Sequence, residues 1–241
     1  MKTTRFLLAA SVSLAMVISC SSSSNGDDDP GSSSSGLTPS SSSSGGTLGG
    51  LLIDARDNQT YRIVVMPDGK TWMSENLNYV DNSWPQNNSS ANFISYSALG
   101  SWCYGNTPSN CDEYGRLYTW NAAMVACPEG WHLPSNNEWK ALVDAIGDDP
   151  IRKLKATSGW TPIGDSSNGT DDYEFSALPG GYRDRNSTVI FKDIGIYGNW
   201  WTSTQYATEE AQMRYIIANG NNVYAQQEVK GYGYSVRCVK D

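Results

Sequence analysis

The hydrophobic pattern is most regular between residues 135 and 147. Apolar side chains recur there at i, i+3, i+4 and i+7, which predicts a helix with one buried face, formed by Trp139, Leu142, Val143 and Ile146. Ser135 is a favourable helix N-cap, and Glu138 three residues later completes a capping box. Gly147 ends the pattern. The segment therefore predicts an amphipathic helix in the middle of the chain.

Two other helices are predicted on either side of this one. Residues 116–126 place Leu117, Trp120, Ala123 and Met124 on one face. Asp149-Pro150 can start a short third helix, because proline is well tolerated in the first helical turn. Residues 80–116 show no period, so we expect a long loop there.

Strand-like runs flank the helical region on both sides. The predicted strands before it are 51–54, 61–66 and 71–73, and those after it are 199–204, 212–218, 222–226 and 234–239. Asn219-Gly220 is a hairpin signal between two of them. The order of strands, helices and strands predicts an α+β fold with antiparallel sheets and two to three helices in the middle of the chain.

Two adjacent tryptophans mark one of these strands. Neighbours on a strand point to opposite faces, so one ring should enter the core and the other should face a loop or solvent. Thr202 and Thr204 share the face of Trp200, and threonine packs well in a half-buried sheet. We therefore expect Trp200 to be buried and Trp201 to lie near the 159–172 loop, either covered by it or open to a ligand.

The first fifty residues differ in composition from the rest. Residues 1–19 carry Lys2 and Arg5 before an apolar run that is too short for a membrane span, which predicts a signal peptide. The sequence Val17-Ile-Ser-Cys20 resembles a bacterial lipobox, which implies cleavage before Cys20 and a lipid on its sulfur. Residues 20–50 are rich in Ser, Gly, Asp and Pro and predict a flexible tether. Residues 51–241 then form one domain.

Charge and cysteine content narrow the function classes. The net charge is −8 and no basic run occurs, so neither nucleic acid nor an anionic membrane surface is an expected partner. Four cysteines remain after Cys20, which predicts two disulfides in an exported domain. A local Cys103–Cys111 bridge and a long-range Cys127–Cys238 bridge are expected. The alternative, a metal site, lacks a CxxC pair and has only one histidine to draw on.

Several motifs together resemble the Fibrobacter succinogenes major paralogous domain. They are Gly115-Arg-Leu-Tyr-Thr-Trp120, Cys127-Pro-Glu-Gly-Trp-His-Leu-Pro134, Phe175-Ser-Ala-Leu-Pro-Gly-Gly181, Asn199-Trp-Trp-Thr-Ser203 and Tyr234-Ser-Val-Arg-Cys238. The turn followed by Glu138-Trp139 is also similar to formylglycine-generating enzymes, which implies a C-type-lectin-like fold. Their paired C-terminal copper-binding cysteines and the calcium motifs of lectins have no counterpart here, so the resemblance implies no catalysis.

The side chains that could act in catalysis or metal binding also fit structural roles. His132 is the only histidine and is expected to be a packed, hydrogen-bonded residue. Arg183 and Asp184 are expected to pair as a buried strut. A pair of carboxylic acids for glycoside hydrolysis would leave no spacing signature in a sequence. The candidates for such a pair are Asp171, Asp172, Glu174, Asp184 and Asp193. Calcium could gather Asp165, Asn168, Asp171 and Asp172, although an acidic loop is the favoured interpretation and no cofactor or metal is expected.

The ligand-binding candidates are aromatic. The chain has nine Trp and fourteen Tyr against four Phe, a composition that suits a half-wet binding face. The candidate platforms in loops or at strand faces are Trp84, Trp102, Trp160 and Trp201. We expect an exported, non-enzymatic, lipid-anchored module at the outer membrane or cell surface that binds a glycan or another extracellular polymer. The alternatives are a structural envelope lipoprotein and, less favoured, an enzyme.

Overall fold

The computed structural model describes residues 50–84, 94–164, 168–186 and 190–241. The predicted signal peptide, Cys20 and the tether lie outside the described residues. The helices are α1 (Pro108–Tyr114), α2 (Trp120–Ala126), α3 (Asn136–Ile146) and α4 (Pro150–Leu154), and η1 (Tyr104–Asn106) is a 3-10 turn. The strands are β1 (Leu51–Ile53), β2 (Thr60–Val65), β3 (Thr71–Met73), β4 (Ser101–Trp102), β5 (Leu117–Tyr118), β6 (Trp131–His132), β7 (Tyr182–Arg183), β8 (Phe191–Lys192), β9 (Tyr197–Gln205), β10 (Glu210–Ile217), β11 (Tyr224–Val229) and β12 (Val239–Lys240).

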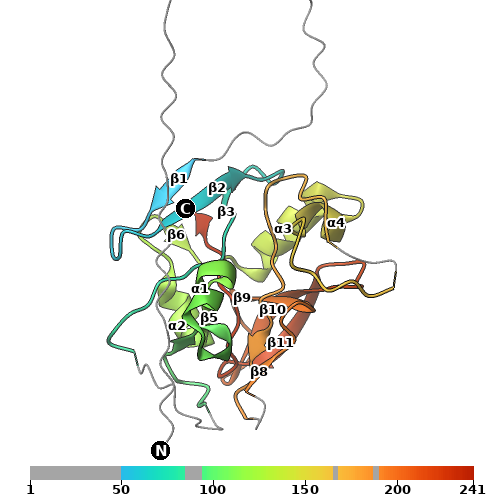
Figure 1. Ribbon diagram of the computed structural model, residues 1–241. Coiled ribbons are helices and arrows are strands. Elements are labelled where there is room, and N and C mark those ends of the chain that lie inside the picture. The colour runs from blue at the N-terminus through green and yellow to red at the C-terminus, as the bar shows by residue number, and fades with distance from the viewer. Residues whose placement is uncertain (1–49, 85–93, 165–167, 187–189) are drawn as a thin grey trace, which may run out of the picture. The chain divides into compact units, whose positions relative to one another are not determined.

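The strands form two main antiparallel sheets, in keeping with the predicted α+β class. One sheet has the order β1-β2-β3-β12-β6, and the other has the order β11-β10-β9 (Figure 1). The strand pairs β4-β5 and β7-β8 form two further, separate two-stranded sheets. The Asn219-Gly220 signal lies in the connection between β10 and β11, which pair antiparallel as predicted.

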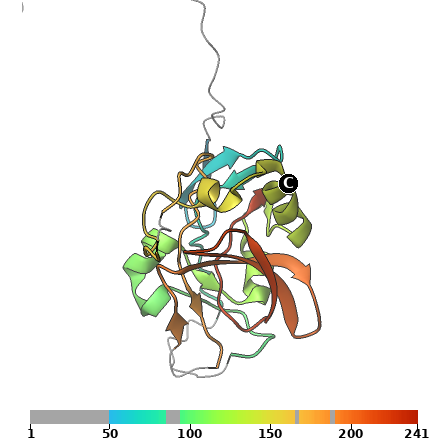
Figure 2. The same ribbon diagram turned by 90° about the vertical axis from the view of Figure 1, so that its right-hand side faces the viewer.

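The first sheet joins the start, the middle and the end of the domain. Strand β12 pairs with β3 through Val239 and Trp72, and with β6 through Val239 and His132. In both views the red C-terminal strand lies among elements of the first half of the domain (Figures 1 and 2). Both predicted disulfides are present: Cys103–Cys111 closes a short loop, and Cys127–Cys238 connects the turn before β6 to the segment before β12.

Helix α3 matches its prediction at both ends. The Ser135 hydroxyl accepts a hydrogen bond from Glu138 N, and a Glu138 carboxylate oxygen accepts one from Ser135 N, so the capping box is formed. Trp139, Leu142 and Ile146 are buried and Val143 is half-buried. The α4 prediction is also confirmed. No helix in the described part of the chain is long and apolar enough to cross a membrane.

The predicted 116–126 helix is shorter, and one helix is new. Leu117 pairs with Trp102 as a strand, so helix α2 begins only at Trp120. Met124, expected on the inner face, is exposed. Helix α1 was not predicted because its sequence, Pro-Ser-Asn-Cys-Asp-Glu-Tyr, has no apolar period; Pro108 begins it and Cys111 anchors it in the core through the short disulfide.

The expectation that Trp201 faces a loop or solvent is wrong, because strand β9 is covered on both faces. Trp200 packs at 5.8 Å from Trp139 of α3. Trp201 packs on the other face at 4.7 Å from Tyr234, and its indole N–H donates to the Tyr118 carbonyl. Both tryptophans are fully buried. The rule that neighbours point to opposite faces holds, but a second layer lies on the face that was expected to be open.

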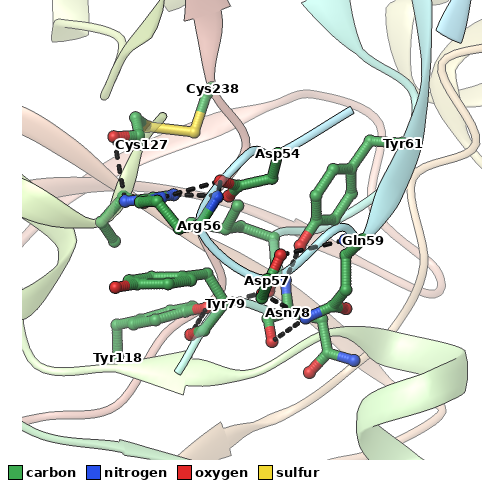
Figure 3. Close-up of polar contacts among 12 residues, drawn as sticks. Asp54, Arg56, Asp57, Gln59, Tyr61, Asn78, Tyr79, Tyr118, Cys127 and Cys238 are labelled. Atoms are coloured by element: carbon green, nitrogen blue, oxygen red, sulfur yellow. Dashed lines mark hydrogen bonds and ion pairs between the residues drawn. A yellow bond between two sulfur atoms is a disulfide. The ribbon is translucent and has the colours of Figure 1, made fainter. Parts of the chain in front are cut away.

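A polar cluster fixes the turn between β1 and β2 (Figure 3). The Arg56 guanidinium donates to both carboxylate oxygens of the buried Asp54 and to the Ala126 carbonyl at the end of α2. It also lies 3.6 Å from the centre of the Tyr79 ring and reaches the Cys127 carbonyl beside the long disulfide (Figure 3). Since the guanidinium is occupied by groups of the protein, the cluster is a structural anchor for the first hairpin.

Candidate ligand-binding site

A hollow of about 250 Å³ opens on one face of the β9-β10-β11 sheet. Alternate residues of the three strands face it, because the pairing places Tyr215 beside Asn199 and Met213 beside Gln226. Helix α3 covers the opposite face, where Arg214 donates to Asn136. We call this feature the tyrosine hollow; its aromatic lining is Tyr182, Tyr197, Tyr215, Tyr232 and Tyr234.

The tyrosines form two groups on separate elements. The first group is Tyr182 of β7, Tyr232 and Tyr234, whose rings contact one another with centres 5.8 to 6.2 Å apart. Tyr197 and Tyr215 form the second group at 6.1 Å. The first group depends on a close backbone approach: Gly233 bridges to Arg183, and a Cβ on Gly233 would lie 2.8 Å from that of Arg183. Glycine therefore lets the C-terminal segment form one wall of the hollow.

Between the aromatic groups the lining is polar and accepts hydrogen bonds. Asn199 is 5% exposed, and its amide N–H donates to the Gly181 carbonyl, which leaves Oδ1 toward the hollow. Tyr234 is 4% exposed, and among the described residues its hydroxyl has no hydrogen-bond partner. Glu228 of β11 accepts one hydrogen bond from Gln226 at 2.5 Å. Asp193 adds a second carboxylate.

The electrostatics of the hollow are negative. Among its described lining residues, Asp193 and Glu228 are acidic and none is Lys, Arg or His. Burial, together with the charges of Glu210 and Asp184, raises the pKa of Glu228. Burial, followed by the charges of Asp193 and Asp184, raises the pKa of Tyr182 to about 12. These shifts have the signs expected for a partly desolvated site with excess negative charge.

Residues 66–240 match the Fibrobacter succinogenes major domain family. The chain belongs to this family. No curated protein and no solved structure gives a significant match to it. The match to the Fibrobacter succinogenes major domain spans the complete lining of the hollow and both disulfides, whereas β1, β2 and the Arg56 anchor precede it.

The tryptophans predicted as ligand platforms do not line the hollow of this Fibrobacter succinogenes major domain. Trp84, Trp102, Trp160 and Trp201 are at most 6% exposed. Trp84 packs edge-on against Tyr79 and Tyr118, and the Arg183 guanidinium lies 4.2 Å from the Trp102 ring. Trp160 donates to the Ala177 carbonyl and faces the Lys155 ammonium. Because protein groups cover these rings, the platform interpretation is wrong and the tryptophans belong to the core.

The hollow was missed because its residues are distant in the sequence. Only Asp193 was among the acidic candidates, and Glu228 was not. A usable signal was present in the alternation of Tyr197 with Asn199, of Met213 with Tyr215, and of Gln226 with Glu228. That alternation assigns these residues to one face of each strand, but it does not show that Tyr182 and Tyr232 lie opposite.

The remaining candidates have structural roles in the described part of the chain. Arg183 is buried as expected, but its predicted partner Asp184 pairs instead with Lys192 at 2.6 Å. The Arg183 guanidinium donates to the backbone carbonyl oxygen of Asp184, not to its carboxylate. The Asp171 carboxylate accepts from the amide and hydroxyl of Ser176 and so closes its own loop.

No described group of His, Cys, Asp and Glu side chains has an arrangement that could hold a metal ion. Of the proposed calcium ligands, Asp165 lies outside the described residues, and both Asp171 oxygens are engaged with Ser176. Asp172 and Glu174 are exposed. A second hollow, of about 200 Å³, borders the Arg62–Glu75 ion pair and is lined mainly by polar groups that already contact one another.

His132 joins two carboxylates at the end of β6. Its Nε2 lies 2.9 Å from Glu138 and its Nδ1 lies 2.6 Å from Asp241, and its side chain is 39% exposed. Burial opposes protonation, but the two carboxylates outweigh it and raise the pKa of His132. The histidine is therefore hydrogen-bonded as predicted, although it lies near the surface rather than in the core.

Proposed function

We propose that this protein is a binding module for a glycan or a similar extracellular polymer, and that the tyrosine hollow holds one unit of that polymer. The observation that carries the proposal is the combination of tyrosine faces and hydrogen-bond acceptors in one open hollow. Binding sites commonly join aromatic walls to a few oriented polar groups. A pyranose ring has apolar C–H faces and a polar rim, so it complements such a lining.

The size and openness of the hollow favour a polymer over a large compact ligand. Its volume of about 250 Å³ lies below the usual range of roughly 300–1,000 Å³ for small-molecule sites. Gln226 on the edge strand β11 is exposed, so one side is open to solvent. A polymer can place one unit in the hollow and continue along the surface.

Binding to insoluble polysaccharides tests the proposal. The purified full chain should sediment with at least one of a panel of β-linked and α-linked glycans, with or without EDTA. Tyr232→Ala should reduce retention about tenfold, because a stacked tyrosine face supplies a large share of such contacts. Tyr206→Ala, at a 58% exposed tyrosine outside the hollow, is the matched control and should not change retention.

The alternative of a structural envelope protein makes the opposite prediction. A protein without a ligand would sediment with none of the polysaccharides, and Tyr232→Ala would then behave as the Tyr206→Ala control does. Retention that Tyr232→Ala leaves unchanged would place binding outside the hollow and overturn the site assignment.

We also propose that the protein is exported and anchored through a lipid on Cys20 at the outer membrane or cell surface. The support comes from the Val17-Ile-Ser-Cys20 sequence after a basic and then apolar segment, and from the polar tether that follows. The two disulfides suit an oxidising compartment. Cys20→Ala should move the protein from the membrane fraction to the soluble fraction; continued sedimentation with membranes would contradict the anchor.

A further inference from the structure

The groups that line the tyrosine hollow are unbalanced in chemical type. The carboxylates of Asp193 and Glu228 and the Oδ1 atom of Asn199 can only accept hydrogen bonds, whereas the tyrosine hydroxyls can donate or accept. The Gln226 amide, which could donate to a ligand, already donates to Glu228. Tyrosine rings add electron-rich faces, which attract cations. A ligand that presents hydrogen-bond donors and a positive charge would complement this lining better than a neutral one.

The two carboxylates of the lining form no salt bridge among the described residues, in contrast to their neighbour Asp184, although the Lys192 charge also acts on Asp193. Asp184 lies close enough to raise the pKa of Tyr182 and Tyr232, and Lys192 pairs with it at 2.6 Å. No ion pair in the described part of the chain includes Glu228 or Asp193. Glu228 and Asp193 are half-buried, so a cationic ligand could pair with either of them at the surface of the hollow.

Two buried polar groups show that the hollow is a built site. The Tyr234 hydroxyl and the Asn199 Oδ1 belong to side chains that are at least 95% buried, and both residues line the hollow. Neither atom has a hydrogen-bond partner among the described residues, and neither belongs to the described polar atoms that are wholly buried, so both keep access to the hollow. Both can be satisfied from the open side, so the interior of the hollow offers its acceptors to a ligand.

We propose that the polymer unit held in the tyrosine hollow carries a protonated amine, and that the ligand is a glycan with free amino-sugar residues. The ammonium group meets a carboxylate of the lining, Glu228 or Asp193, and the pyranose ring lies against the tyrosines. This inference rests on the proposed glycan-binding function and specifies its ligand class. A sugar is favoured over a lysine side chain because the two aromatic groups complement a flat ring better than a flexible chain.

The test compares three oligosaccharides with the same β-1,4 backbone and length. They are a glucosamine hexamer, an N-acetylglucosamine hexamer and a glucose hexamer, measured by calorimetry against the full chain. At about pH 6 the amine of the glucosamine hexamer is protonated. The glucosamine hexamer should bind about tenfold or more tightly than the other two. Its affinity should fall with added salt, because the charges are partly exposed.

Two isosteric variants locate the charge. Glu228→Gln and Asp193→Asn should each lower the affinity for the glucosamine hexamer about tenfold and leave that for the neutral hexamers unchanged. Glu129→Gln, at an exposed turn outside the hollow, is the control. Unchanged thermal melting shows that each variant is folded, and two separate variants keep the test informative if one is not.

The outcomes separate this inference from the function on which it rests. Equal affinity for all three hexamers overturns the claim that the bound unit carries an amine, while the proposal of glycan binding stands. If the glucose or N-acetylglucosamine hexamer binds best, the claim that the bound unit carries an amine is overturned as well. Failure to bind any hexamer or any polysaccharide of the panel overturns both proposals. Tighter binding of a lysine hexapeptide than of the glucosamine hexamer, with loss in Glu228→Gln, overturns the sugar assignment in favour of a cationic protein segment.

Discussion

Tryptophan residues of this domain are held by contacts on both sides of the strands that carry them. Trp200 lies against Trp139 at 5.8 Å, and Trp201 lies against Tyr234 at 4.7 Å. The indole N–H of Trp201 donates to Tyr118, and that of Trp200 donates to Asn76. Each ring therefore combines a large buried apolar area with a satisfied polar atom, as buried indoles require.

Replacing Trp201 should destabilise the domain. Trp201→Ala removes a fully buried ring and one of the two donors to the Tyr118 carbonyl, which keeps its bond from Tyr234 N, so the free energy of unfolding should fall by about 3–5 kcal/mol. Urea denaturation measures this change. Tyr206→Ala, at an exposed tyrosine, should change it by less than about 0.5 kcal/mol. Equal stability of Trp201→Ala and wild type would show that the ring is not part of the core.

The residues show which features a sequence can predict. The Trp139, Leu142 and Ile146 face follows from helical period alone and is confirmed. The fate of Trp201 depends on Tyr234, 33 positions later, and no local pattern records that contact. The tyrosine hollow was missed for the same reason, because Tyr182 and Tyr232 approach the sheet face from other parts of the chain.

At the scale of elements, short segments are fixed by charged side chains at their ends. Helix α3 begins with a capping box, and Glu138 of that box also meets Lys70 at 2.7 Å and His132 at 2.9 Å. Burial would raise the pKa of Glu138, but hydrogen bonds from Lys70, Ser135 and His132 outweigh it and lower the pKa to about 2. The start of α3 is thereby joined to β3 and β6.

This network predicts a bounded pH range of stability. Glu138 has a lowered pKa in the folded state, so its contribution is present above about pH 4.5 and is lost as pH falls toward 2. His132 has a raised pKa, so its contribution is present below about pH 6.5 and is lost as pH rises through the folded value. Melting temperature should therefore be highest between about pH 5 and 6.5.

Matched variants show which residue causes the fall in melting temperature at acid pH and which causes the fall at higher pH. Glu138→Gln should flatten the decline on the acid side, and His132→Gln should flatten the decline on the basic side. Glu129→Gln, at an exposed residue outside the network, should preserve the wild-type profile. An acid limb that survives in Glu138→Gln would assign it to other carboxylates.

The turn between β1 and β2 gives a second prediction for an element. Arg56→Ala leaves the carboxylate of Asp54, which is 1% exposed, without its ion pair (Figure 3). Because Arg56 itself is 29% exposed, water compensates in part, and we expect a loss of about 2 kcal/mol. Hydrogen exchange should rise first in β1 and β2. A uniform rise throughout the domain would contradict a local anchor.

At the scale of the whole domain, the C-terminal segment connects its main parts. Residues 232–240 supply Tyr232 and Tyr234 to the hollow, cover Trp201, carry Cys238 and end in β12 between β3 and β6. The number and spacing of the cysteines predicted the Cys127–Cys238 bridge, and the β-rich run predicted a strand at this end. It did not predict that only Val239 of the expected 234–239 strand would lie in a strand, namely β12, because residues 233–235 instead make isolated bridges to Tyr118, Arg183 and Trp200.

The two disulfides should therefore differ in what they stabilise. Cys127–Cys238 spans 111 positions and Cys103–Cys111 spans 8, so loop entropy alone predicts losses of about 5 and about 2.5 kcal/mol when each pair is changed to serine. Urea denaturation of the two double variants measures the difference. Cys238 lies four positions after Tyr234, so Cys127→Ser/Cys238→Ser should also weaken polysaccharide retention at temperatures where the domain is still folded. Retention equal to wild type under those conditions would mean that the Tyr232 and Tyr234 wall is held by its backbone bridges alone.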